Sequence, residues 1–371
     1  MLIKNANVFL PDGHFGKCDV RFTHSIREIG AFPGEEGIDA EGKYLVPGFL
    51  DVHTHGAMGC DFSDGVAEDM PKMARFYAAH GVTGFLATTM TLPQETLCRA
   101  ARAIASFSPE PDMASCAGVF MEGPFLSYAK RGAQFADYLH APDIAFFDAV
   151  NAASGGRVRM ITVAPEEPGA IPFIEYAAKR CTVAVGHTAA DYDAAVAGFQ
   201  AGATELTHLY NGMNGLHHRS PGPIGAGMDA HANAELICDG LHVHPSAVRA
   251  AFAMFPGRVV LISDSLRCAG MPEGDYMLGG QPITMKNGLC TLRGSDTIAG
   301  SVITVHDAVK NAVAFGVPLE TAIAAATHNA ARAVRLDRER GLVRVGLAAD
   351  LVLLDAKLEI VDVFLRGERL S

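Results

Sequence analysis

Short apolar runs alternate with amphipathic segments through the middle of the chain, and this alternation restricts the possible folds severely. The eight apolar runs lie at residues 46–53, 82–89, 117–122, 158–166, 181–187, 203–208, 234–240 and 258–264. Most segments between them have helical periodicity, as at Leu97, Ala101 and Ile104. Buried parallel strands read as continuous apolar runs, whereas the helices that connect them have a period of 3.6 residues. Eight such units predict an α/β fold built on a (β/α)8 barrel.

The two ends of the chain have a different character, because both are short, β-like and rich in turns. Residues 1–45 contain LIKNANVFL and KCDVRF, and residues 345–371 contain ADLVLLD and EIVDVFLRGERL. Chain ends often lie close together. We therefore expect a small β-sandwich domain from residues 1–45 plus 345–371, beside a barrel domain of residues 46–344. Residues 264–303 are predicted to hold an insertion with a hairpin that turns at Lys286-Asn287-Gly288.

Charge and cysteine usage exclude several classes of protein. The formal net charge is −11, which argues against a nucleic-acid partner because phosphate backbones need a basic surface. No apolar run reaches the roughly 18 residues of a membrane helix, and the first residues do not resemble a signal peptide. The eight cysteines include no CxxC pair, so neither a zinc knuckle nor a disulfide framework is expected. A cytoplasmic location is predicted.

Polar residues that suit metal binding stand at the ends of five of the eight runs. In a (β/α)8 barrel the C-terminal ends of the strands surround one mouth, where active sites lie. Side chains far apart in the sequence can therefore converge there. The residues are His53, His55, Glu122, His187, His208 and Asp264.

Imidazole nitrogens and carboxylate oxygens together suit Zn²⁺, Fe²⁺ or Mn²⁺. His53 and His55 are two residues apart, so in a strand both side chains point to the same face. A lone histidine at a strand end is more often structural, and an aspartate after an apolar run is often a helix cap. Because ligand-type residues recur at so many strand ends, a divalent metal site is favoured. Asp264 is then placed for general acid–base catalysis.

Several motifs together resemble one known family. They are HTHG at 53–56, MEGPF at 121–125, GHT at 186–188, THLYNGM at 207–213, DGLHV at 239–243 and LISD at 261–264. These resemble the N-acetylglucosamine-6-phosphate deacetylase family of the amidohydrolase superfamily, and the similarity runs from PGFLDVHTHG to GLAADLVLLD. The resemblance implies a metal-dependent hydrolase of amino-sugar catabolism. Such an enzyme converts N-acetyl-D-glucosamine 6-phosphate to D-glucosamine 6-phosphate and acetate.

The resemblance also implies roles for the residues at the mouth. Glu122, His187 and His208 match the family's metal ligands, and Asp264 matches its catalytic aspartate. His53 and His55 match a pair that supports a second metal in some members. One or two divalent ions, Zn²⁺ or Fe²⁺, are therefore expected in each subunit.

Substrate-binding residues are implied in the same way, although each also has a simpler explanation as a turn, cap or surface residue. The resemblance implies contacts with the sugar phosphate for Asn211, Gly212 and Arg219, and with the sugar for His242. Ile298, Ala299 and Gly300 match a loop over the substrate. Ala133 and Gln134 match a pair of substrate-binding residues, and Gln134 can donate a hydrogen bond to the acetyl oxygen. Arg219 is expected to reach the neighbouring active site of a homodimer. Gln134 departs from the family, since some members have histidine at this position.

Three alternatives remain open from the sequence. The first is a sister enzyme that acts on N-acetylgalactosamine 6-phosphate, which differs from the glucosamine compound in the orientation of one hydroxyl group. The second is another amidohydrolase, such as an adenine deaminase or a dipeptidase, and the phosphate-contact match at Asn211 and Arg219 argues against it. The third is a barrel without catalytic activity, which is disfavoured because every metal-ligand position is filled.

Overall fold

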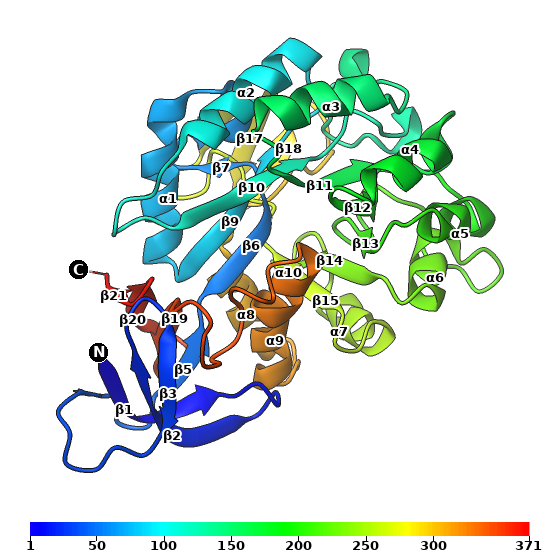
Figure 1. Ribbon diagram of the computed structural model, residues 1–371. Helices are drawn as coiled ribbons and strands as arrows, with labels where there is room; N and C mark the ends of the chain where they lie inside the picture. The colour runs from blue at the N-terminus through cyan, green and yellow to red at the C-terminus, as the bar shows by residue number, and fades with distance from the viewer. Residues whose placement is uncertain (371) are drawn as a thin grey trace.

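A parallel eight-stranded barrel forms the body of the protein in the computed structural model, which describes residues 1–370 (Figure 1). Its strands run in sequence order from β6 to β15. A hydrogen bond of 2.8 Å from the Asp264 backbone N–H to the His53 carbonyl brings the end of β15 beside β6. The strands are β6 (Phe49–Thr54), β9 (Val82–Thr89), β10 (Ser115–Met121), β11 (Val158–Val163), β12 (Thr182–Val185), β13 (Glu205–Leu206), β14 (Asn233–Ile237) and β15 (Val259–Ile262). Each overlaps one of the eight apolar runs, with shifts of one or two residues at the ends of some strands, so the predicted (β/α)8 barrel is confirmed.

Helices follow the strands and cover the outside of the barrel (Figure 1). Leu97, Ala101 and Ile104 are all buried, as their spacing predicts. The Gly- and Pro-rich segment after β13 also forms a helix, α6. No helix within residues 1–370 is long and apolar enough to cross a membrane. The helices are α1 (Met70–Ala79), α2 (Gln94–Ser106), α3 (Ile144–Ala153), α4 (Ala170–Ala177), α5 (Tyr192–Gln200), α6 (Gly222–Asp229), α7 (Pro245–Met254), α8 (Val305–Ala314), α9 (Leu319–Ala326) and α10 (His328–Ala333).

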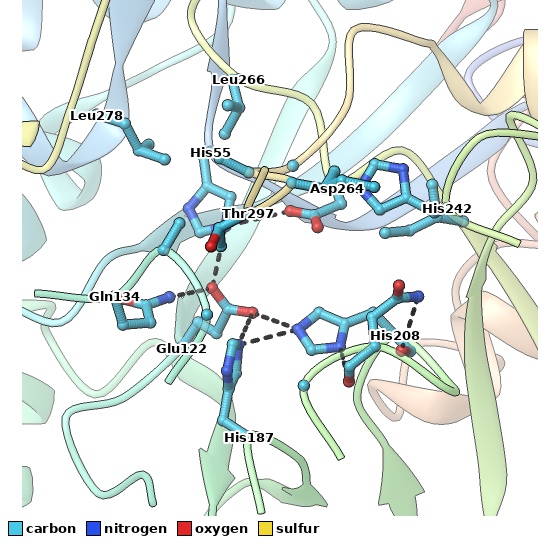
Figure 2. Close-up of a pocket in the computed structure, with 18 of the residues that line it drawn as sticks. His55, Glu122, Gln134, His187, His208, His242, Asp264, Leu266, Leu278 and Thr297 are labelled. Carbon is cyan, nitrogen blue, oxygen red and sulfur yellow. Dashed lines mark hydrogen bonds and ion pairs between the residues drawn. The ribbon is translucent and has the colours of Figure 1, made fainter. Parts of the chain in front are cut away.

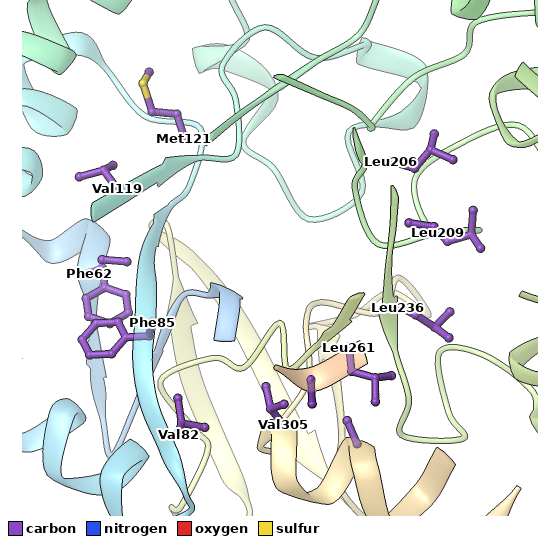
Figure 3. Packing of buried hydrophobic residues seen from close by; sticks show 14 of the residues in the cluster. Phe62, Val82, Phe85, Val119, Met121, Leu206, Leu209, Leu236, Leu261 and Val305 are labelled. Carbon is purple, nitrogen blue, oxygen red and sulfur yellow. The ribbon is translucent and has the colours of Figure 1, made fainter. Parts of the chain in front are cut away.

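The barrel strands are apolar on both faces, which explains their continuous runs. In β15, Val259 and Leu261 belong to the core that the outer helices share, whereas Val260 and Ile262 belong to a separate cluster. Successive residues of a strand point to opposite faces, so this second cluster fills the barrel interior. Ala330 of α10 joins it and closes one end. Figure 3 shows part of the outer core.

Both chain ends build a second sheet beside the barrel, as expected. Its strand order is β21-β20-β19-β5-β1-β2-β3, with β4 paired to β1. Leu45 pairs with Leu353, so the N- and C-terminal parts of the sheet join there. The strands are β1 (Leu2–Phe9), β2 (Phe15–Phe22), β3 (Ile26–Gly30), β4 (Ile38–Asp39), β5 (Tyr44–Pro47), β19 (Leu351–Leu354), β20 (Ile360–Leu365) and β21 (Glu368–Arg369). The division into domains at residues 45 and 345 stays a prediction, and β5 extends two residues past the first boundary.

An insertion after β15 forms a small antiparallel sheet of β16 (Gly274–Leu278), β17 (Gln281–Lys286) and β18 (Leu289–Leu292). Lys286 pairs with Leu289, so Asn287 and Gly288 form the predicted turn. Their φ angles of 51° and 74° are left-handed, as a two-residue hairpin turn requires. Another short hairpin, β7 (Gly56–Ala57) with β8 (Cys60–Asp61), follows β6.

Candidate metal centre and active site

A cavity of about 320 Å³ lies at the C-terminal ends of the barrel strands. This volume suits a small-molecule ligand. The residues expected at the site that line the cavity are His55, Glu122, Ala133, Gln134, His187, His208, Asn211, Gly212, His242, Asp264, Ile298, Ala299 and Gly300. His53 is fully buried and contacts the same cluster from within the protein. The convergence predicted from the strand ends therefore occurs.

The carboxylate of Glu122 lies at the centre of this cluster (Figure 2). Its Oε1 is 2.9 Å from Nε2 of His208 and 3.1 Å from Nε2 of His187. Its Oε2 is 3.2 Å from Nε2 of His55. The residues form two groups with the spacing of metal ligands, one of Glu122, His187 and His208 and the other of His53, His55 and Asp264. Glu122 contacts histidines of both groups and can serve both.

Three of the four histidines have their other ring nitrogen held by an acceptor. The pairs are His53 Nδ1 with Glu235 Oε2 at 2.9 Å, His187 Nδ1 with the Lys130 carbonyl at 2.8 Å, and His208 Nδ1 with the Asn211 carbonyl at 3.1 Å. These acceptors require a proton on Nδ1, so a neutral ring presents the Nε2 lone pair to the cluster. This is the tautomer that a metal ligand needs.

A polar atom without a partner supports the same interpretation. Among the described residues, His53 Nε2 faces Glu122 and Asp264, is buried, and has no hydrogen-bond partner. The Nε2 atoms of His187 and His208 lie only 3.0 Å apart. Asp264 Oδ1 is 3.3 Å from His55 Nε2 and 3.6 Å from His53 Nε2. Converging imidazole nitrogens and carboxylate oxygens, with the buried Nε2 atom of His53 left unsatisfied, fit a divalent cation.

The backbone at three of these strand ends is unusual. His187, His208 and Asp264 have φ angles of 46°, 28° and 50°. Left-handed backbone is uncommon outside glycine, and such strain clusters at functional sites. Two backbone hydrogen bonds of 2.8 Å hold Asp264 in this conformation. Its N–H donates to the His53 carbonyl, and its own carbonyl accepts from the Ser301 N–H.

The surroundings keep both carboxyl groups charged at neutral pH. Burial raises the pKa of Glu122, but when His53 and His187 are protonated their positive charge outweighs this effect and holds that pKa well below its usual value. Burial also raises the pKa of Asp264, whereas His53 and His55 lower it by more, so the net shift is downward. Asp264 is therefore ionised at neutral pH and can accept a proton.

The structure shows two hydrogen bonds of the Gln134 side chain that the sequence did not predict. Its Oε1 accepts a hydrogen bond from the Thr91 N–H at 2.7 Å, and its Nε2 donates to Glu122 Oε2 at 2.6 Å. The expected contact with an acetyl oxygen stays a prediction. The neighbouring Ala133 carbonyl accepts from Gln281 Nε2 at 2.6 Å, which ties the inserted sheet to this loop.

The remaining expected residues differ in how the chain places them. His242 lines the cavity, and its Nδ1 is paired with Asp239 Oδ2 at 2.6 Å. Gly212 has a φ of 58°, and a Cβ there would lie 3.0 Å from His187 Nδ1, so glycine suits the position. Arg219 is exposed and does not line the cavity, and its Nη1 atom is 2.7 Å from His218 Nε2. A single chain therefore does not bring Arg219 into the site.

Two supporting groups were not anticipated from the sequence. Glu235 is fully buried and holds His53, and the Lys130 carbonyl holds His187. A charged residue inside the apolar run at 234–240 was a signal for Glu235. No sequence signal pointed to the backbone carbonyl of Lys130.

Comparisons with known proteins agree with the resemblance drawn from the motifs. The model of the amidohydrolase family matches residues 44–370. The N-acetylglucosamine-6-phosphate deacetylase of Vibrio furnissii is 35% identical over 350 residues, which cover 92% of this chain and 88% of the relative. The N-acetylgalactosamine-6-phosphate deacetylase of Escherichia coli O157:H7 is 36% identical over 337 residues, with coverage of 90% and 89%.

A solved structure shows the same similarity in three dimensions. A variant of the N-acetyl-D-glucosamine-6-phosphate deacetylase from Mycobacterium smegmatis, in complex with N-acetyl-D-glucosamine-6-phosphate, has a TM-score of 0.92 and 33% sequence identity. The match covers 100% of this chain and 99% of that chain.

Proposed function

The chain belongs to the amidohydrolase family, and we propose that it hydrolyses N-acetyl-D-glucosamine 6-phosphate to D-glucosamine 6-phosphate and acetate. The observation that carries this proposal is the pair of ligand groups around Glu122, with Asp264 beside them in a cavity of substrate size. Relatives with this activity match the chain over most of its length.

Glu122, His187 and His208 would hold one divalent ion. His53, His55 and Asp264, with Oε2 of Glu122, would hold a second. The nitrogen and oxygen donors suit Zn²⁺ or Fe²⁺. When bound, such an ion supplies Lewis acidity that activates water and polarises the acetyl carbonyl.

Asp264 performs the proton transfers. Its carboxylate accepts a proton from the water molecule that attacks the acetyl carbonyl carbon, and a tetrahedral intermediate forms. Asp264 then gives this proton to the sugar nitrogen as the carbon–nitrogen bond breaks. Amines leave poorly without protonation, so one carboxyl group acts first as a base and then as an acid.

Loop residues orient the substrate. Asn211 and Gly212 face the sugar phosphate, His242 contacts the sugar ring, and residues 298–300 cover the substrate. Arg219 lies outside the cavity of its own chain. In a homodimer it reaches the phosphate group of the substrate that is bound in the neighbouring subunit. A planar guanidinium is well suited to bind phosphate. The predicted cytoplasmic location is part of this proposal.

An acetate-release assay on protein of measured metal content tests the function. The assay compares N-acetylglucosamine 6-phosphate with N-acetylgalactosamine 6-phosphate at equal concentrations. A higher kcat/KM for the glucosamine compound is expected. A higher value for the galactosamine compound would favour the alternative that the Escherichia coli relative represents. Release of acetate from neither compound by metal-loaded protein would refute both.

A further inference from the structure

Gln134 is a polar side chain in the active site that the proposed mechanism leaves without a role. It is 4% exposed and lies in the loop between β10 and α3. Figure 2 shows its amide directed at the carboxylate of Glu122. A buried amide beside a charged group has to satisfy both its donor and its acceptor atoms.

The orientation of this amide is determined by its neighbours. The Thr91 backbone N–H can only donate, so the oxygen of the Gln134 amide must face it, at 2.7 Å. The NH₂ group then faces Glu122 and donates to Oε2 at 2.6 Å. The opposite assignment would place two donors together at Thr91 and two oxygens together at Glu122.

The backbone around Gln134 is also held in place. Its own N–H donates to the Arg131 carbonyl at 2.9 Å. One residue earlier, the Ala133 carbonyl accepts from Gln281 of β17. Thr91, which holds the amide oxygen, contacts the Glu122 carbonyl through its hydroxyl group at 3.4 Å. The amide nitrogen therefore has a fixed position relative to Glu122.

This hydrogen bond determines how the carboxylate of Glu122 is oriented. With Oε2 held by Gln134, Oε1 stays 2.9 Å and 3.1 Å from the Nε2 atoms of His208 and His187. Without Gln134, Oε2 would keep only its contact with His55 at 3.2 Å. Hydrogen bonds to a charged acceptor are strong, and partners that hold metal ligands often change metal affinity by 10- to 100-fold.

We propose that Gln134 is a positioning residue that fixes the carboxylate plane of Glu122 and thereby strengthens divalent-metal binding by Glu122, His187 and His208. This role rests on the proposed function, because it requires that Glu122, His187 and His208 bind a metal ion. It differs from the acetyl contact expected from the sequence, in which Gln134 would act on the substrate.

The test is the Zn²⁺ dissociation constant of the full-length, metal-free protein, measured by competition with a chelator. Gln134→Met keeps the length of the side chain and removes the donor. We expect its Zn²⁺ binding to be about 10-fold to 100-fold weaker than that of the wild type. Excess Zn²⁺ should restore kcat, and KM should change little.

Gln281→Met is the matched control, because it removes a hydrogen bond that holds the same loop without touching Glu122. Its Zn²⁺ affinity should equal that of the wild type. If Gln134→Met does not fold, Gln134→Leu provides the second variant, since its smaller apolar side chain also removes the donor to Glu122 and adds no charge. Zn²⁺ binding by this variant should also be weaker than wild type.

The possible outcomes separate this inference from the proposed function. If the wild type does not bind Zn²⁺, the metal site and the proposed function both fail. If the wild type binds Zn²⁺ and the Gln134 variant binds it equally well, the positioning role is overturned and the function stands. Equal weakening in the Gln134 and Gln281 variants would overturn it too, because loop placement would then be the cause.

Discussion

At the scale of single residues, the two carboxylates of the site differ in their partners. Both oxygens of Glu122 contact histidine rings, which suits a residue that stays ionised as a metal ligand. The two imidazole contacts of Asp264 both involve Oδ1, so Oδ2 is the atom that can exchange a proton with substrate. Different environments for two neighbouring carboxyl groups commonly separate their roles in catalysis.

Asp264→Asn tests the role in proton transfer. The amide cannot accept the proton of the attacking water, so we expect kcat to fall by about 100- to 10,000-fold. Acetate release measures this loss, and metal analysis checks that Zn²⁺ remains bound through Glu122, His187 and His208. Near-normal turnover in this variant would rule out the assignment.

Asp51 predicts a pH dependence of stability. It is 1% exposed, and burial raises its pKa to about 7 in spite of hydrogen bonds from Ser263. Because the folded pKa lies above the unfolded value of about 3.9, the folded state binds this proton more tightly. The stability from this group is therefore present at low pH and is lost as the pH rises toward 7.

Asp51→Asn removes the titration and keeps the shape of the side chain. The free energy of unfolding of this variant, minus that of the wild type, should increase from about pH 4 to about pH 7. Urea unfolding at several pH values measures the difference. A difference that does not change with pH would contradict the raised pKa.

At the scale of secondary-structure elements, the start of helix α8 limits the loop that carries residues 298–300. Helix α8 begins directly after the segment that carries residues 298–300. Thr304 caps this helix, since its hydroxyl accepts from the Asp307 N–H at 3.2 Å and its own N–H donates to Asp307 Oδ2 at 2.9 Å. This reciprocal pair is a capping box, and it determines where the covering loop ends and the helix starts.

Thr304→Ala should therefore lower the free energy of unfolding by about 1 kcal/mol. Urea unfolding at constant pH measures the change. Thr304→Ser is the control, because it keeps the capping oxygen and should lose much less stability than the alanine variant. Equal losses in the two variants would mean that packing of the threonine methyl group, and not the cap, is responsible.

At the scale of the whole molecule, the barrel gathers ligands from five strand ends, and the sheet from both chain ends lies beside it. Only Gly48 separates β5 of that sheet from β6, which carries His53. One chain builds the metal cluster and the cavity, and Arg219 does not line that cavity. The proposed homodimer accounts for this residue, because a partner can supply the arginine.

Subunit mixing tests the proposed dimer. Asp264→Asn and Arg219→Ala chains should each have low activity alone. In their heterodimer, the site of the Arg219→Ala chain has an intact Asp264 and receives Arg219 from its partner, so activity should return. Refolding the two variants together and measuring acetate release gives the result. No gain over the separate variants would indicate that Arg219 does not act across an interface.

The sequence by itself determined the architecture and the inner residues of the site. Strand and helix periods are local properties, so eight apolar runs were enough to predict the barrel. The rule that strand ends meet at one mouth then brought Glu122, His187, His208 and Asp264 together. The family motifs added roles for residues in the loops.

Only the tertiary structure decided which atoms meet. The pairing of Glu235 with His53, and of Gln134 with Glu122, joins side chains from different strands and loops. Such contacts depend on strand stagger, loop path and the direction of each amide or ring, none of which has a local pattern in the sequence. For the same reason, the sequence could not show that Arg219 lies outside the cavity of its own chain, because that position depends on how the whole chain folds.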